Sequence, residues 1–245
     1  MSNASGSFSG QILNPRQRRR RIYLLAVALG PLPVYAMTFV NALLSDQPYS
    51  PQDLIIYTTA ISLPIIVILL LLLRYLCGEG PRDLNLKPGK WTSDLSAAAI
   101  LSVVTLSANV ISNPLLGEVL PAPPNTGVIE LFRRLGESPA MLALFLGVML
   151  WIAVAQEELT RVFLLSRLWK VWPSNAAKWG AVLLSASLFG LAHAWQGPTR
   201  IVWTGIYGLI MGGYYLRYGR VAPMIISHYF TNALQVVVFV LRMSP

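Results

Sequence analysis

Seven long runs of apolar residues, separated by shorter polar segments, make up most of the 245-residue chain. A helix needs about 20 mainly apolar residues to cross a bilayer. We therefore predict membrane spans at about residues 22–44, 53–76, 93–112, 138–165, 178–196, 201–217 and 221–241. In the sixth run, Gly208 and Gly212 form a GxxxG pattern, which favours close approach of two helices. The pattern predicts an all-α fold, a polytopic membrane helical bundle with about seven transmembrane helices.

Two polar segments interrupt this pattern. The first fifteen residues are rich in Ser, Asn and Gly, and five arginines follow within residues 16–21. We expect a disordered basic N-terminal tail over residues 1–21 and a single membrane domain over residues 22–245. The first apolar run is longer than the h-region of a signal peptide, which is about 7–15 residues, and is interpreted as a retained span. The longest polar connection, 113–137, contains an amphipathic piece around Ile129–Leu135.

Composition supports a membrane protein. Hydrophobic residues make up 55% of the chain and charged residues 12%, whereas a soluble domain carries roughly 25% charged residues. This excludes intrinsic disorder and a collagen-like chain, and it disfavours a soluble enzyme because too little polar surface is available. The single cysteine, Cys77, cannot form an internal disulfide.

The formal charge of +9 is concentrated in the segments between apolar runs. With the N-terminus inside and seven spans, the loops on the outer side hold only Arg133, Arg134, Arg200 and Arg242. Most other Lys and Arg residues then face the cytoplasm, as the positive-inside rule requires. We expect an integral protein of the bacterial inner (cell) membrane with a cytoplasmic N-terminus. Its basic residues then interact with the lipid bilayer, and no nucleic-acid partner is expected.

Ionisable residues inside spans are costly unless they are paired or hydrated, and they often mark function. Three of the predicted spans carry such residues, namely Glu157, Glu158 and Arg161 in the fourth, His193 near the end of the fifth, and His228 with Asn232 in the seventh. An ion pair between Glu157 and Arg161, four residues apart, is the simplest structural explanation. It leaves Glu158 unexplained, since adjacent residues point about 100° apart around a helix.

These residue types suit peptide hydrolysis. A carboxylate, Glu157 or Glu158, could serve as general base for water, and His193 could hold that water or help to deprotonate it. His228 and Asn232 share one helix face and could stabilise an oxyanion, while Arg161 would fix the Glu pair. Alternatively, His193, His228 and Glu157 could bind zinc around an open site, with the other glutamate as base. The sequence does not choose between the two mechanisms.

The three motifs resemble those of the CPBP family, the CAAX protease and bacteriocin-processing (Abi) membrane endopeptidases. That family carries a Glu-Glu pair followed by Arg, then FxxxH, then HxxxN or HxxxD, on separate membrane helices. The chain has Phe189–His193 and His228–Asn232 in full. The resemblance covers about residues 138–241 and implies that this segment is the catalytic core.

The first motif departs from the family pattern EExxxR, because this chain reads EExxR. If Arg161 is the fixed point, the acidic pair falls on Gln156 and Glu157, and glutamine cannot act as a base. If Glu157 and Glu158 are the pair, the arginine lies one residue closer. We favour the second register, which keeps a base.

The resulting hypothesis is an intramembrane endopeptidase that hydrolyses a peptide bond in a membrane-associated substrate through a water activated by glutamate. The resemblance implies a peptide or lipidated-protein substrate, either a CAAX-like C-terminus or a bacteriocin-type peptide. The alternative is a catalytically inactive pseudoprotease scaffold or a small ion- or proton-linked transporter, which the register with Gln156 favours.

Overall fold

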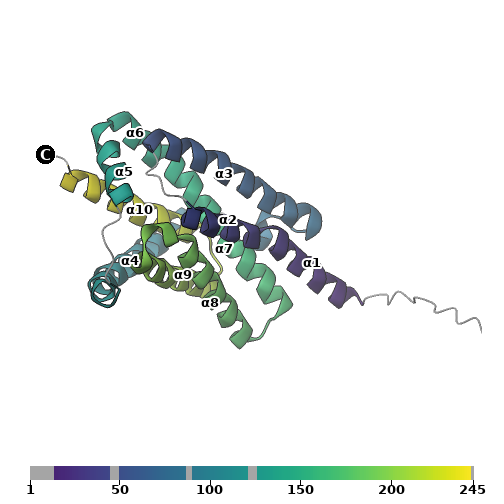
Figure 1. The fold of residues 1–245 in the computed structure, drawn as a ribbon. Coiled ribbons are helices and arrows are strands. Elements are labelled where there is room, and N and C mark those ends of the chain that lie inside the picture. Colours follow the sequence, from purple (N-terminus) through teal and green to yellow (C-terminus); the bar gives the residue numbers. More distant parts are fainter. Residues whose placement is uncertain (1–13, 45–49, 87–89, 121–125, 244–245) are drawn as a thin grey trace, which may run out of the picture.

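The computed structural model describes residues 14–44, 50–86, 90–120 and 126–243, and these residues form helices and connecting turns without a β-strand. In chain order the helices are α1 (Pro15–Leu29), α2 (Pro31–Leu44), α3 (Pro51–Leu71), η1 (Leu72–Leu76), η2 (Pro81–Leu84), α4 (Trp91–Val119), α5 (Thr126–Glu137), α6 (Pro139–Leu144), η3 (Phe145–Met149), α7 (Leu150–Val171), α8 (Asn175–Ala192), η4 (Ala194–Gln196), α9 (Pro198–Tyr218) and α10 (Ala222–Met243). The predicted all-α fold is confirmed (Figure 1).

Five stretches in the described part of the chain are long and apolar enough to cross a membrane: Pro15–Asn41, Pro51–Leu76, Trp91–Val119, Pro139–Val171 and Ala222–Arg242. They confirm five of the seven predicted spans and an integral membrane protein. The other two predicted spans are also helical, as α8 and α9, but they do not reach the same apolar content. The physical reason is composition: polar residues such as Lys178 and Ser187 interrupt α8, and Arg200 and Thr204 interrupt α9.

The N-terminal region is more ordered than expected from its composition. Residues 1–13 of the predicted tail lie outside the described residues. From Pro15 onward the chain is helical, so residues 15–21 belong to α1. The Asn14 side chain accepts hydrogen bonds from the backbone of Arg16 and Gln17, and the Gln17 side chain accepts one from the backbone of Asn14. This capping box satisfies the first free N–H groups of the helix, and the Arg and Gln residues that follow favour a helix themselves.

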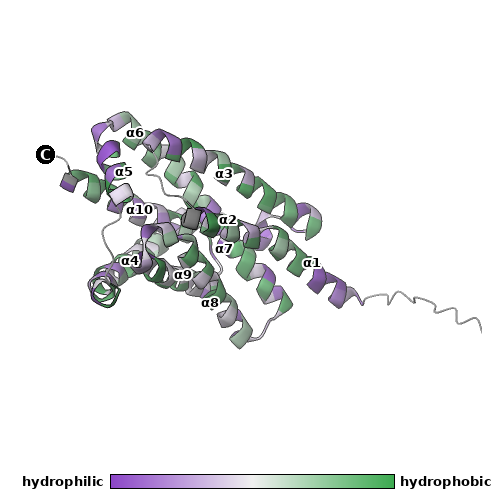
Figure 2. Ribbon diagram, in the orientation of Figure 1, coloured by the Kyte–Doolittle hydropathy of each residue, from purple (hydrophilic) through white to green (hydrophobic). Residues whose placement is uncertain are grey.

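Helix α7 is the centre of the bundle. It packs against α1, α3, α8 and α10, and its residues 162–165 are completely buried. In Figure 1, α3 runs alongside α7, and α8 and α9 form a hairpin beneath it. The start of α1 and the end of α10 lie at opposite ends of the bundle. The outer surface is apolar, with exposed side chains such as Ile56 and Ile100, and Figure 2 shows hydrophilic residues gathered at the start of α1 and on α5.

Small residues bring α8 and α9 close together, as the GxxxG pattern predicts. A Cβ placed on Gly208 would lie 3.0 Å from Ala186 Cα, and one on Gly212 would lie 2.9 Å from a Val182 methyl group. At Gly190 the same atom would lie 2.6 Å from the Ile201 carbonyl oxygen. In a bilayer, such backbone proximity is a main source of helix association because lipid is as apolar as the side chains. It also fixes the end of α8, where His193 lies, against the start of α9.

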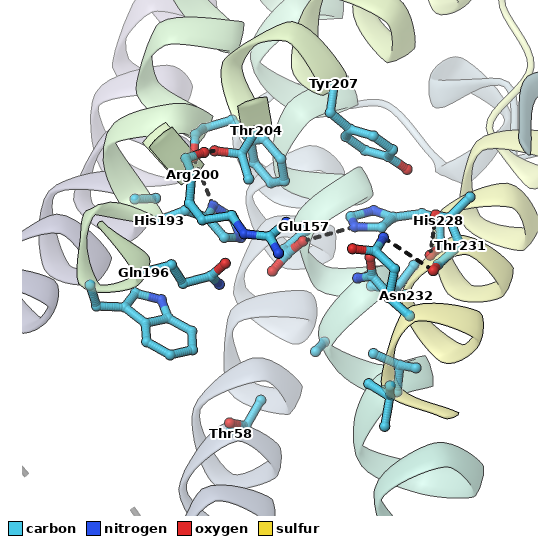
Figure 3. Close-up of a pocket in the computed structure, with 18 of the residues that line it drawn as sticks. Thr58, Glu157, His193, Gln196, Arg200, Thr204, Tyr207, His228, Thr231 and Asn232 are labelled. Carbon is cyan, nitrogen blue, oxygen red and sulfur yellow. Dashed lines mark hydrogen bonds and ion pairs between the residues drawn. The ribbon is translucent and has the colours of Figure 1, made fainter. Parts of the chain in front are cut away.

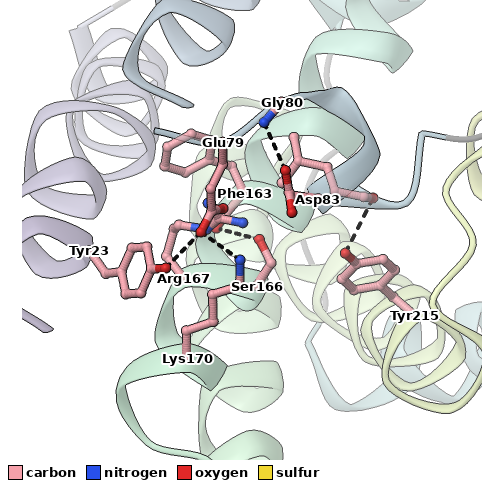
Figure 4. Close-up of polar contacts among 10 residues, drawn as sticks. Tyr23, Glu79, Gly80, Asp83, Phe163, Ser166, Arg167, Lys170 and Tyr215 are labelled. Carbon is pink, nitrogen blue, oxygen red and sulfur yellow. Dashed lines mark hydrogen bonds and ion pairs between the residues drawn. The ribbon is translucent and has the colours of Figure 1, made fainter. Parts of the chain in front are cut away.

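A buried carboxylate, Glu79, binds the C-terminal part of α7 to α1. Glu79 follows α3 and η1, and it accepts hydrogen bonds from Tyr23 (2.6 Å) and Lys170 (2.7 Å) and pairs with Arg167 (Figure 4). Arg20 of α1 also donates to the Val171 carbonyl at the end of α7. Burial raises the pKa of Glu79, but the hydrogen bonds from Lys170 and Tyr23 and the charge of Arg167 lower it more, so its pKa lies below its ordinary value.

A pH-dependent contribution to stability follows. A carboxyl group whose pKa is lower in the folded state stabilises the fold above its unfolded pKa, and this stabilisation disappears as the pH falls through the folded value. We expect Glu79→Gln to lower the free energy of unfolding near neutral pH by about 1–3 kcal/mol. The difference from wild type should narrow below pH 4.5. Thermal unfolding in detergent over a pH series would measure it, with the exposed Glu137→Gln as control. An equal loss of unfolding free energy at acid and at neutral pH would contradict the explanation by the charge of Glu79.

Candidate active site

A cavity of about 500 Å³ lies between α7, α8, α9 and α10, with further walls from α2, α3, α4, α5 and η3. Its wall combines apolar side chains with polar side chains from several helices. The polar side chains include Gln156, Glu157, Thr160, His193, Gln196, Arg200, Thr204, Tyr207, His228, Thr231 and Asn232. Figure 3 shows that most of these side chains converge from opposite sides of the cavity. Four of the six predicted site residues thus line one space: Glu157, His193, His228 and Asn232.

The two adjacent glutamates have different surroundings. The Glu157 side chain is 28% exposed and lines the cavity. Glu158 is fully buried and forms an ion pair with the equally buried Arg161, three residues later on α7. The Glu157–Arg161 pair considered from the sequence is therefore wrong: the helix turns Glu158 toward Arg161 and leaves Glu157 facing the cavity. The 100° step between neighbours separates the two carboxylates.

His228 connects the two glutamates. Its Nδ1 lies 2.7 Å from Glu158 Oε1, and its Nε2 lies 3.5 Å from Glu157 Oε2. Because an ionised carboxylate only accepts hydrogen bonds, Nδ1 carries a proton and donates it to Glu158. The Tyr207 ring packs against the imidazole with a centroid distance of 4.8 Å. Glu158 therefore fixes the orientation of His228 and directs Nε2 to Glu157 and the cavity.

The FxxxH motif has a structural explanation. His193 Nδ1 lies 2.8 Å from the Phe189 carbonyl oxygen, one helical turn earlier, and the two rings pack at 4.6 Å. The Phe189 ring also contacts Arg161, whose guanidinium lies 4.3 Å from the centre of the ring. Since a carbonyl only accepts, Nδ1 is the protonated nitrogen of neutral His193, and Nε2 is the acceptor. Phe189 thus joins the buried ion pair to the cavity histidine.

Several polar residues of the cavity were not identified from the sequence. Arg200, Thr204 and Tyr207 come from α9, at spacings of four and three residues that place them on one helix face. Arg200 was assigned to a loop outside the membrane, and Thr204 and Tyr207 were not singled out. The spacing itself was a usable signal, because a polar stripe on an otherwise apolar helix favours an internal, hydrated face.

The donor set of the cavity does not match the zinc alternative. Within the described parts of the chain, no group of three or more His, Cys, Asp or Glu side chains is arranged to hold a metal ion. Glu158 is bonded to both His228 and Arg161, so it is not available as a further ligand beside His193, His228 and Glu157. A closed structural zinc site uses four ligands and a catalytic one three. We therefore derive no step through a metal.

Membrane-spanning helices that surround a cavity with carboxylate and imidazole groups define a polytopic membrane protein with an internal polar site. Residues 138–234 match the family model of type II CAAX prenyl endopeptidase Rce1-like proteins, and this segment is a domain of that family. The resemblance to the CAAX protease and bacteriocin-processing family is confirmed over these residues, which contain all three motifs. The match implies an endopeptidase of the CAAX type. Neither the search of curated proteins nor that of solved structures gave a match.

Proposed function

We propose that this protein is an intramembrane endopeptidase in which Glu157 activates the attacking water. One observation carries the proposal: Glu157 is the acidic residue on the cavity wall of the described chain, and its carboxylate lies 3.5 Å from His228 Nε2 in the cavity that His193 also lines. A base must be within hydrogen-bond reach of the proton that it removes, directly or through water. A water held between Glu157 and His193 meets this requirement.

The chemistry can be assigned to the remaining residues. Glu157 takes a proton from water, and the oxygen adds to the carbonyl carbon of the substrate. In this scheme His228 is the imidazolium, with its Nδ1–H donated to Glu158. Its Nε2–H and the amide of Asn232, one turn later on α10, donate to the oxyanion that forms. The C–N bond then breaks, and protonated Glu157 returns its proton to the leaving amine. Glu158 and Arg161 do not touch the substrate in this scheme; they position His228.

The substrate and topology complete the proposal. The cavity is partly apolar and lies inside the bundle, which suits a peptide segment carrying a lipid, as in a CAAX-like C-terminus, or a hydrophobic bacteriocin-type peptide. We also propose that α8 and α9 cross the membrane with the five longer spans, which gives seven crossings and a cytoplasmic N-terminus. The contacts of Arg20 and Lys170 bring basic residues of α1 and α7 to the same end of the bundle, as the positive-inside rule requires.

Gln156 supports one alternative, a catalytically inactive scaffold. Its side chain donates to the Thr160 hydroxyl (3.0 Å) and lines the same cavity. In the register with Arg161 fixed, this glutamine replaces the glutamate that the family uses to activate water. A transporter built on the same polar cavity is the remaining possibility, and proton-linked flux in vesicles would support it.

A comparison of peptide termini in membrane proteomes distinguishes these functions without knowledge of the substrate. Cells expressing wild type are compared with cells expressing His193→Ala at equal protein level. We expect at least one new terminus that appears only with wild type, because the variant lacks the imidazole that holds the water. Identical termini in both samples would count against proteolysis and favour the scaffold or transporter.

A further inference from the structure

Arg200 is a cation in the cavity without an acidic partner. It lies in the first turn of α9, is half-buried and lines the cavity with Glu157. Among the described residues, no Asp or Glu lies within ion-pair distance of it, whereas Arg161, Arg167 and Arg220 all have such a partner. In Figure 3 its side chain reaches from α9 toward Glu157 and His193. The guanidinium therefore presents a positive charge to the cavity with no carboxylate of the described chain paired to it, so an anionic ligand group can bind there.

The backbone around Arg200 is firmly placed. Its carbonyl accepts a hydrogen bond from Thr204 (2.7 Å), and the neighbouring Thr199 hydroxyl donates to the Leu120 carbonyl at the end of α4 (3.2 Å). The close contact at Gly190 fixes this turn against α8. The guanidinium is thus presented by a rigid element, as a specific binding group should be.

Arg200 and the catalytic groups share one cavity. Tyr207, seven residues further along α9, packs against His228, and both line the cavity with Arg200. Because the Arg200 side chain extends toward Glu157 (Figure 3), an anion bound by its guanidinium would lie in the same space as the cleaved bond. That anion is most simply the carboxylate at the end of the substrate, since guanidinium groups bind carboxylates by paired hydrogen bonds.

We infer that Arg200 binds the C-terminal carboxylate of the substrate and so selects peptides whose C-terminus lies near the cleaved bond. The inference rests on the proposed protease function and adds the residue that decides its specificity. An alternative role is also clear: Arg200 could serve only to balance the charge of Glu157. The two roles differ in one measurable respect, because charge balance alone gives no preference between a free acid and an amide.

The test compares two farnesylated peptides of one sequence ending in Cys-Val-Ile-Ser, one with a free C-terminal carboxylate and one with a carboxamide. Binding is measured to the full-length protein carrying Glu157→Gln, so that nothing is cleaved. We expect the acid to bind about 10- to 100-fold more tightly than the amide. Adding Arg200→Gln should remove this preference, and Arg200→Lys should keep part of it. Arg217→Gln, an exposed arginine at the other end of α9, is the matched control and should leave the preference unchanged.

Equal binding of acid and amide by Glu157→Gln, a preference that survives Arg200→Gln, or no binding of either peptide would each overturn the inference. Cleavage by wild type is measured in parallel on the same peptides. If wild type cleaves neither peptide while binding still depends on Arg200 and the carboxylate, the inference stands and the proposed protease function fails. If wild type cleaves both peptides equally well, with no preference in binding, the protease function stands and the role of Arg200 is wrong.

Discussion

Replacing Glu157 with glutamine is expected to lower kcat/KM for peptide cleavage by about 10²- to 10⁴-fold, the usual contribution of a general base. The substitution keeps the size of the side chain and removes its ability to accept a proton. Because Glu157 is part-exposed to the cavity and its contact with His228 Nε2 is long, at 3.5 Å, the fold should be unaffected. Cleavage of a farnesylated peptide by purified protein in detergent, together with thermal unfolding, measures both effects.

Two further variants make this prediction specific. Glu130→Gln, on α5 and outside the cavity, should keep wild-type turnover. Gln156→Glu tests the other register of the motif, in which a glutamate at 156 would be the base. We expect no gain from Gln156→Glu, because the Gln156 side chain is directed to Thr160. Full turnover by Glu157→Gln, or a large gain from Gln156→Glu, would contradict the assignment of the base.

Removing the Arg161 guanidinium is expected to cause the largest loss of stability. Arg161→Ala leaves Glu158 fully buried without its ion-pair partner, and breaking a buried pair in this way typically costs about 3–5 kcal/mol. The Phe189 ring also loses the cation above it. Because Glu158 orients His228, activity should fall as well. The measurement is thermal unfolding in detergent with peptide cleavage on the surviving folded protein.

The double variant Glu158→Leu with Arg161→Met provides the internal comparison. It removes both charges and fills the space with apolar groups, so it should be more stable than Arg161→Ala alone. Activity should not return, since His228 Nδ1 then lacks its acceptor. A surface comparison is Arg134→Ala, which breaks an exposed pair with Glu130 on α5 and should change the unfolding temperature little. An equally small effect of Arg161→Ala would show that the buried pair is not a structural requirement.

Much of the fold could be predicted from the sequence because helix formation in a membrane is a local requirement. Backbone N–H and C=O groups have no water partners there, so an apolar run of sufficient length must form a helix. The described helices correspond to all seven predicted segments. The membrane assignment of α8 and α9 stays a prediction, because both carry polar residues at the cavity or at the helix ends and neither is among the five long apolar stretches of the described chain. The amphipathic piece at 129–135 is likewise present, within α5, with Leu131 and Leu135 buried.

The sequence predicted which residues belong to the candidate site, but not how they are arranged in space. Glu157, His193, His228 and Asn232 were identified because polar side chains in apolar helices are unusual, and all four line the cavity. Arg200 was missed as a cavity residue. In the sequence, a basic residue near the end of an apolar run is indistinguishable from one in the adjoining loop. The Glu79 cluster was missed as well, because it joins residues separated by 88 and 91 positions in the chain.

The sequence by itself determined the class of protein: apolar length and composition required a helical membrane bundle, and three short motifs located the residues able to do chemistry. Tertiary structure decided which of two adjacent glutamates meets the cavity and which meets Arg161. That choice depends on the rotation of α7 against its neighbours. Rotation is set by packing with α3, α8 and α10, and no local pattern encodes it, because residues one position apart are equally compatible with a helix. The same packing brought Arg200 into the cavity and left it without an acidic partner among the described residues.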